Sequence, residues 1–237
     1  MTSGWEESAA AWIADMGEHG DFGRRYVLDP VMLPLALANG AKTALDVGCG
    51  EGRFCRMLAA RGIAVSGVDP TPSLINHAQQ RDPQGTYIQT DAAKLPFGDG
   101  AFDLVVSYLS LIDIPEIAPA IAEITRVLEP GGRLLIANLT AFNTAGQETD
   151  WSLDEHGKRK HFQIDHYLTE SAAWIEWRGI RIRNHHRPLS AYMKLLLAQG
   201  LTLTHFDEPR PTADAPTDRA ANYVRAPWFL VMEWAKP

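Results

Sequence analysis

The stretch Leu45-Asp46-Val47-Gly48-Cys49-Gly50-Glu51-Gly52-Arg53-Phe54 decides the fold. A short apolar run ends in Asp46, three alternating glycines follow, and a helical stretch begins after them. Because glycine accepts positive φ and lets a ligand approach the main chain, such a turn can wrap a ligand with bare backbone. The helix after the turn offers free N–H groups and the positive end of its dipole to an anion. The stretch therefore predicts a nucleotide-like ligand at the end of the first strand of an open α/β sheet.

The spacing of the glycines argues against a dinucleotide. A dinucleotide fingerprint needs the pattern G-x-G-x-x-G/A. Gly48 and Gly50 fit this pattern, but its sixth position is Arg53, and the third glycine stands one residue early at Gly52. A pyrophosphate cradle is therefore not expected.

The form Asp-x-Gly-Cys-Gly-x-Gly resembles motif I of the class I S-adenosylmethionine-dependent methyltransferases. Leu95-Pro96-Phe97, followed by Phe102-Asp103-Leu104-Val105-Val106, resembles the branch that includes ubiquinone-biosynthesis and many small-molecule enzymes, and Glu129-Pro130-Gly131-Gly132 belongs to the same pattern. The resemblance covers roughly residues 45–236. It implies S-adenosyl-L-methionine as cofactor and S-adenosyl-L-homocysteine as product, with the methionine carboxylate received by the glycine turn.

Length and charge limit the classes of partner. The 237 residues suit one α/β domain, and a net charge of −7 argues against duplex nucleic acid as the main substrate. Residues 1–20 show no signal peptide, and no apolar run is long enough to span a bilayer. We therefore expect a cytoplasmic monomer or homodimer that acts on a small molecule, without nucleic-acid or membrane partners.

The two cysteines, Cys49 and Cys55, are expected to be reduced thiols. Six residues apart on one helix, they would not face each other, which makes a disulfide improbable. His156, His161 and His166 lack a recognised metal-ligand spacing, so no metal site is expected.

Alternation of strands and helices predicts parallel βαβ units, with early strands at 43–47, 63–68 and 86–89. The expected fold is α/β, a Rossmann-like three-layer sandwich with a seven-stranded, mostly parallel sheet, an antiparallel last strand and a lid inserted after strand five. The chain then divides into an N-terminal helical lid (1–40), a cofactor-binding core (41–137), a substrate-cap insert (138–188) and C-terminal strands (189–237). Within the insert a hairpin is expected about Gly179, and residues 209–227 are expected to form a proline-rich loop.

Acidic residues follow the strands at the edge where ligands bind. Asp69 ends the second strand and is expected to accept the ribose hydroxyls; the alternative is an N-cap for the following helix. Asp91 and Ala92 match the adenine site of the family, although an Asp here also suits a turn. Leu74 matches the family position that packs on adenine, or is ordinary core.

The resemblance assigns further residues. Asp46 would help hold the methionine ammonium, and the carbonyl of Ser107 would face the same amine. In the segment Gly23–Tyr26 the Tyr26 hydroxyl would bond the cofactor carboxylate with Arg25 paired to it, or Tyr26 would serve as a buried anchor. The whole expected cofactor set is Tyr26, Asp46, Gly48, Cys49, Gly50, Asp69, Pro70, Leu74, Asp91, Ala92 and Ser107.

The reaction implied is in-line attack of an acceptor atom on the sulfonium methyl, with oxygen favoured, then carbon or nitrogen. Candidate catalytic bases near the strand ends are His186 and Tyr108. For His185 and His186 the alternative is a hydrogen bond that supports the entry of the next helix. Three tryptophans of the insert suit either an aromatic substrate pocket or cover for a sheet edge, namely Trp151, Trp174 and Trp177.

Two other functions remain open on the sequence. One is a non-catalytic, regulatory protein that binds S-adenosylmethionine. The other is an aminopropyl transferase on the same fold, which would need an acidic cluster for a polyamine. Residues 108–113 show no such cluster.

Overall fold

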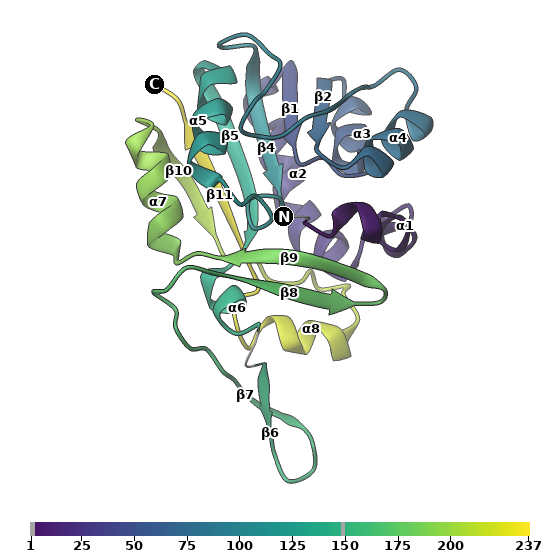
Figure 1. Ribbon diagram of the computed structural model, residues 1–237, viewed down its shortest axis with the longest axis vertical. Helices are drawn as coiled ribbons and strands as arrows, with labels where there is room; N and C mark the ends of the chain where they lie inside the picture. Colours follow the sequence, from purple (N-terminus) through teal and green to yellow (C-terminus); the bar gives the residue numbers. More distant parts are fainter. Residues whose placement is uncertain (1–2, 148–149) are drawn as a thin grey trace.

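A computed structural model describes residues 3–147 and 150–237. Its central sheet has seven strands in the order β10-β11-β5-β4-β1-β2-β3 (Figure 1). The parallel strands are β1 (Thr43–Val47), β2 (Ala64–Asp69), β3 (Thr86–Gln89), β4 (Phe102–Tyr108) and β5 (Leu128–Leu139). β11 (Phe229–Ala235) runs antiparallel between β5 and the edge strand β10 (Thr202–Asp207). The predicted α/β fold with an antiparallel last strand is therefore confirmed.

Helices cover both faces of the sheet because each presents an apolar side to it (Figure 1). On one face lie α5 (Ile117–Val127) and α7 (Leu189–Ala198), and α5 buries Ile117, Ile121 and Ile124 at helical spacing. On the other face lie α2 (Asp29–Leu37) and α3 (Arg53–Ala59). α4 (Pro72–Arg81) follows β2. No helix in the described parts of the chain is both long and apolar enough to cross a membrane.

The N-terminal forty residues form two parts, one packed against α4 and the insert and the other packed against the sheet. α1 (Trp5–Met16) packs its apolar side against α4 and the insert. The π-helical turn η1 (Arg24–Leu28), α2 and the short 3₁₀ turn η2 (Ala38–Gly40) follow. Met32 and Ala36 of α2 are fully buried against the sheet, so this part of the predicted lid belongs to a core layer.

The insert consists of α6 (Ala141–Ala145) and two hairpins, which Figure 1 shows beyond the carboxyl ends of the sheet strands. The hairpin of β8 (Ser171–Trp177) and β9 (Ile180–His186) confirms the turn predicted about Gly179, where φ is 80°. The hairpin of β6 (Trp151–Leu153) and β7 (Arg159–Phe162) projects from the body and has no counterpart in the sequence-based expectation. The His185 N–H donates to the Ile112 carbonyl at 2.7 Å, which fastens β9 to the β4–α5 loop.

The prediction that residues 209–227 form a loop is wrong in part. Residues 209–227 contain the helix α8 (Thr217–Tyr223). The helix begins directly after Pro216, where the proline occupies the cap position and costs no helical hydrogen bond. A short helix between prolines shows little apolar periodicity, which explains why the segment looks like a loop.

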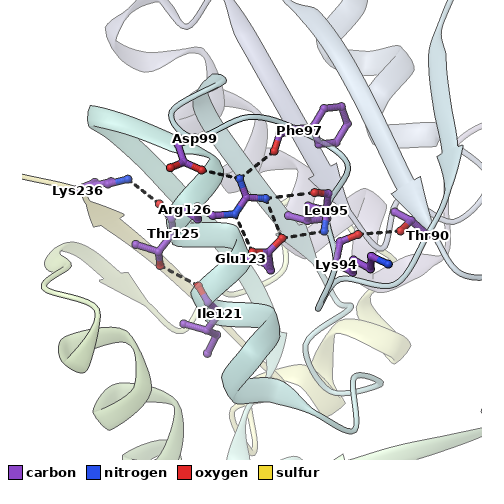
Figure 2. A network of polar contacts seen from close by, with 10 residues as sticks. All are labelled: Thr90, Lys94, Leu95, Phe97, Asp99, Ile121, Glu123, Thr125, Arg126 and Lys236. Carbon is purple, nitrogen blue, oxygen red and sulfur yellow. Dashed lines mark hydrogen bonds and ion pairs between the residues drawn. The ribbon is translucent and has the colours of Figure 1, made fainter.

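Arg126 of α5 holds the loop after β3 in place through hydrogen bonds and ion pairs (Figure 2). The Arg126 guanidinium donates to the carbonyls of Phe97 at 2.9 Å and Leu95 at 3.2 Å. It also pairs with the carboxylates of Asp99 and Glu123, and Glu123 accepts the Leu95 N–H at 2.9 Å. The Leu95–Phe97 stretch that carried part of the resemblance is thus held against α5, which fixes the end of the loop that begins at Asp91.

Candidate active site

A cavity of about 600 Å³ opens at the carboxyl ends of the parallel strands. Its wall comes from the glycine turn, the ends of β2 and β3, the β4–α5 loop, the N-terminal segment and the β8–β9 hairpin. Cavities of this size hold small-molecule ligands and cofactors. The cavity therefore lies at the edge of the sheet where the sequence predicts a ligand.

The glycine turn exposes backbone to this cavity. Gly48 has φ 77° and Gly50 has φ 55°, values that L side chains adopt at a cost. A Cβ on Gly48 would lie 2.3 Å from Ser110 Cβ, so the β4–α5 loop leans directly on the turn. A Cβ on Gly50 would meet only the Trp12 indole nitrogen, at 3.8 Å. Space is therefore open beside Gly50, as a bare-backbone site requires.

Asp69 joins the end of β2 to the glycine turn. Its Oδ2 accepts the Gly50 N–H at 2.9 Å, and its Oδ1 accepts the Thr71 N–H at 2.9 Å. Burial raises the pKa of Asp69, while these hydrogen bonds act in the opposite direction. A carboxylate has about four acceptor positions, so Asp69 can still accept ligand hydroxyls from the cavity that it lines.

Asp46 carries an unpaired oxygen. Its Oδ1 is buried and accepts no hydrogen bond from the described residues, while its Oδ2 accepts from the Cys55 thiol at 3.4 Å. Burial raises the pKa of Asp46 to about 7. A buried carboxylate oxygen without a partner is costly, and it fits a cationic donor such as an ammonium group. The residues present therefore suit the amino-acid end of S-adenosylmethionine.

The other expected cofactor residues at the ends of β2 and β3 also line the cavity. Leu74 is only 2% exposed and packs with Trp12 and Met16 of α1, so its two proposed roles are compatible. Asp91 is exposed, and its Oδ1 accepts the Ala93 N–H at 2.8 Å, the geometry of the turn that was the alternative. The cavity wall in this region comprises Asp69, Pro70, Leu74, Asp91 and Ala92.

Two expected cofactor residues lie away from the cavity wall. Ser107 is fully buried behind it, and its hydroxyl shares a 2.7 Å hydrogen bond with Ser110. Tyr26 packs on Phe22 with ring centres 5.2 Å apart, which favours the buried-anchor alternative.

Arg24 lines the cavity in place of Tyr26 and Arg25. Its guanidinium lies 4.7 Å from the Trp12 ring centre and pairs with Asp21 at 3.0 Å. The basic pair Arg24-Arg25 was visible in the sequence, but only the π-helical turn decides which of the two side chains faces inward.

The two candidate bases have other partners. Tyr108 lines the cavity, but its hydroxyl donates to Asp29 at 2.8 Å, and burial together with Asp29 raises its pKa well above the ordinary value. His186 does not line the cavity; its Nδ1 bonds Thr144 Oγ1 at 2.7 Å and its Nε2 bonds the Tyr167 carbonyl at 2.9 Å. Because a carbonyl only accepts, Nε2 carries the proton. The geometry of His186 favours the structural alternative, because both of its hydrogen bonds hold other parts of the insert in place.

Asp113 is an acidic residue of the site that sequence reasoning missed. It lies in the β4–α5 loop on the cavity wall, and its Oδ1 accepts the Asn184 amide at 2.6 Å. Burial raises its pKa to about 7. One signal was available, an acid within the apolar run 109–115, but its partner on β9 stands 71 residues away in the chain.

Aromatic side chains cover the rest of the cavity wall. Among the three tryptophans of the insert, Trp177 lines the cavity, and Trp174 is 41% exposed beneath the Arg181 guanidinium. Trp151 borders a separate, shallower hollow beside the β6–β7 hairpin. The other aromatic residues of the cavity wall are Trp5, Trp12, Phe22, Phe54, Tyr108, Tyr223, Trp228 and Phe229.

The expectation that the two cysteines would not face each other is wrong. Both are free, and both sulfur atoms lie beside Gly67 of β2. A Cβ on Gly67 would lie 2.8 Å from the Cys49 sulfur and 3.0 Å from the Cys55 sulfur. Cys49 belongs to the turn before α3, where positive φ at Gly50 and Gly52 reverses the chain, so helical spacing does not apply.

Arg53 occupies the position where a dinucleotide fingerprint has its third glycine. Its guanidinium pairs with Asp29 of α2 and donates to the His19 carbonyl at 3.0 Å. The side chain thus ties α3 to the N-terminal segment, and the third glycine of the turn stands one residue earlier, at Gly52. Among the described residues there is also no group of three His, Cys, Asp or Glu side chains that could hold a metal.

Comparison with known proteins agrees with this geometry. A family model described as a methyltransferase domain matches residues 45–136. The chain is 30% identical over 162 residues to the ubiquinone biosynthesis O-methyltransferase of Coxiella burnetii, across 62% of this chain and 69% of that protein. It is also 30% identical over 141 residues to the malonyl-[acyl-carrier protein] O-methyltransferase of Serratia marcescens, across 60% of this chain and 53% of that protein.

Among solved structures, an S-adenosylmethionine-dependent methyltransferase from Mesorhizobium loti superposes with a TM-score of 0.80 at 26% identity, over 93% of this chain and all of that one. The chain spans about half the length of several curated relatives that it matches. Sequence motif, fold, cavity and relatives agree, and the chain belongs to the class I S-adenosylmethionine-dependent methyltransferases, whose cofactor is S-adenosyl-L-methionine.

Proposed function

We propose that this chain transfers the methyl group of S-adenosylmethionine to a small-molecule acceptor, with oxygen as the methylated atom ahead of carbon or nitrogen. One observation carries the proposal. The cavity continues from the cofactor residues at the ends of β1–β3 into a second, aromatic part beside α1, β8 and β9. A protein that only bound the cofactor would need no such extension. The two relatives named above are both described as O-methyltransferases, which supports oxygen.

The proposed cofactor contacts follow the polarity of each residue. The backbone at Gly48, Cys49 and Gly50 would receive the carboxylate, and the unpaired Asp46 oxygen would accept from the ammonium. Asp69 would accept the ribose hydroxyls. At the adenine end, Asp91 and Ala92 would bond the base edge while Leu74 and Pro70 pack nearby. Bound there, the cofactor supplies an electrophilic methyl group on a positively charged sulfur.

The protein contributes mainly by positioning the two reactants and by keeping water out of the cavity. α1 and the β8–β9 hairpin cover the cavity, and they are joined by the Ser8 hydroxyl bonding the Arg181 carbonyl at 3.0 Å and by the Arg178–Asp15 ion pair at 2.6 Å. Holding two reactants in near-attack geometry can lower a barrier by roughly 7–11 kcal/mol. We propose that these two elements form the substrate lid.

An aminopropyl transferase is less well supported. A polyamine would need unpaired carboxylates on the acceptor side of the cavity. Asp15 and Asp21 there are paired with Arg178 and Arg24, which leaves Asp113, bonded to the Asn184 amide, as a single carboxylate without an arginine partner in place of a cluster. The acidic net charge of −7 likewise favours a small acceptor over duplex nucleic acid.

The test is transfer of a radiolabelled methyl group from S-adenosylmethionine to a panel of phenols, carboxylic acids and amines. We expect label in at least one small acceptor and stoichiometric release of S-adenosylhomocysteine. Tight cofactor binding without transfer to any acceptor would instead favour the non-catalytic alternative. Size-exclusion chromatography with light scattering separates the proposed monomer from the homodimer.

A further inference from the structure

We infer that Asp113 is the catalytic base of this site and that the acceptor is a phenolic hydroxyl compound whose proton Asp113 removes. The inference rests on the methyl transfer proposed above. It adds a residue and an acceptor class that neither the motif nor the relatives specify.

Asp113 lies close to the part of the cavity where the reacting groups would meet. The Ser110 side chain touches the Gly48 position and its hydroxyl donates to the Val47 carbonyl at 2.6 Å, so the β4–α5 loop rests on the glycine turn. The Asp113 N–H donates to the Ser110 carbonyl at 3.0 Å. This single turn of chain sets the carboxylate beside the turn that would hold the amino-acid end of the cofactor.

The carboxylate is held in place from the insert. Asn184 of β9 donates to Asp113 Oδ1 at 2.6 Å, and the Gln147 amide donates to Asn184 Oδ1 at 3.1 Å. Trp5 also faces Asp113, and its side chain lowers the pKa of that carboxyl. The Asn184 amide occupies one of the roughly four acceptor positions of the carboxylate, which leaves positions for a substrate O–H. All four residues line the cavity.

The surroundings of Asp113 suit a base that works near neutral pH. Burial raises its pKa to about 7; Asp69 also raises it, and Arg24 lowers it. Tyr192 of α7 faces the same region and stays neutral because burial raises its own pKa. A base is most effective when its pKa lies near the working pH.

The other candidate bases are occupied by hydrogen bonds or lie outside the cavity wall. The Tyr108 hydroxyl donates to Asp29, and both ring nitrogens of His186 are bonded. His185 lies outside the cavity wall, and burial with the charges of Arg187 and Arg183 lowers its pKa to about 4.

The cavity wall favours a phenol over an amine. The aromatic side chains of Trp12, Trp177 and Tyr223 line this part of the cavity and suit contact with a planar ring. The Arg219 guanidinium, on the same wall and 4.5 Å from the Phe22 ring centre, would repel a cationic amine and tolerate the developing phenolate.

The acceptor oxygen forms a bond to the methyl carbon while the carbon–sulfur bond breaks, and the bonding pair stays on sulfur, which leaves a neutral thioether. The O–H proton passes to an Asp113 carboxylate oxygen, which later returns it to water. No oxidant or reductant is involved.

The experiment compares Asp113→Asn and Asp113→Ala with the wild type, with cofactor saturating so that Asp46 does not titrate in the measured step. The probes are phenol and p-nitrophenol, the second of which ionises without help near neutral pH. With phenol we expect kcat to fall by roughly 10²- to 10⁴-fold. With p-nitrophenol the loss should be far smaller. The acid limb near pH 7 in the wild-type kcat profile should vanish in Asp113→Asn. The exposed Asp99→Asn serves as the unaffected control.

Two further measurements do not depend on turnover. The ¹³C signal of the Asp113 carboxyl should titrate near pH 7, and cofactor affinity should differ by less than about threefold between wild type and Asp113→Asn, which is under 1 kcal/mol. An equal loss with both phenols, a retained acid limb, or titration below pH 5 would overturn the role of Asp113. Cofactor binding with turnover of amines or acids but of neither phenol would overturn the acceptor class. Failure of the wild type to bind cofactor would refute the proposed function itself.

Discussion

The two halves of the cavity are built in different ways. The cofactor half lies within residues 46–92 and relies on backbone and on acids that directly follow strands. The acceptor half combines Trp12 of α1, Asp113 of the β4–α5 loop, Trp177 and Asn184 of the insert, and Tyr223 of α8. A site made by one stretch of chain can be recognised in sequence. A site assembled from distant side chains can be recognised only in the fold.

The largest expected effect concerns the backbone of the cofactor half. Gly48→Ala and Gly62→Ala both place a side chain at positive φ, 77° and 86°, which costs about 1–2 kcal/mol of stability in each. Only the Cβ at Gly48 also collides, because nothing lies within 4 Å of one at Gly62. We expect calorimetry to show no cofactor binding by Gly48→Ala and normal binding by Gly62→Ala. Equal affinities would mean that the turn is not the binding element.

Asp69→Ala should produce the next largest effect. The substitution removes the acceptor proposed for the ribose and the bonds that hold Gly50 and Thr71. Losing hydrogen bonds to a charged group costs about 3 kcal/mol, or about 100-fold in cofactor affinity. The exposed Asp99→Ala is the control. Affinity of Asp69→Ala within a few-fold of wild type would remove Asp69 from the site.

The pH dependence of cofactor affinity tests Asp46. In the free protein its pKa is about 7, and an ammonium ligand binds the ionised form. Below pH 7 the proton must leave first, so affinity should rise about tenfold per pH unit up to pH 7 and then level off. Asp46→Asn should flatten this profile. Asp103→Asn, at the opposite end of β1 where Asp103 accepts from the Lys42 and Thr43 N–H groups, should keep it.

The smallest effect is expected in the acceptor half. Trp177 and Trp174 lie on the same strand, but only Trp177 lines the cavity. Trp177 is partly buried, and its truncation should cost about 1 kcal/mol of acceptor binding, seen as an increase of about fivefold in KM. Trp174→Ala should leave KM unchanged. A higher KM in Trp174→Ala than in Trp177→Ala would place the acceptor outside the acceptor half of the cavity.

The sequence predicts the fold well where periodicity is local. β1 and β3 have the bounds predicted from their apolar patterns, residues 43–47 and 86–89. The sequence does not predict arrangements that depend on tertiary contacts. The choice of Arg24 over Tyr26 depends on a π-helical turn, and the partner of Asp113 stands on a distant hairpin. No local pattern encodes either arrangement.

Calorimetric titration of the purified protein with S-adenosylmethionine, S-adenosylhomocysteine and NADH tests the central claim most directly. We expect one molecule of either sulfur compound to bind per chain and NADH to give no heat, because Arg53 stands where a pyrophosphate turn needs glycine. Binding of NADH in place of the sulfur compounds, or binding of none of the three, would contradict the account.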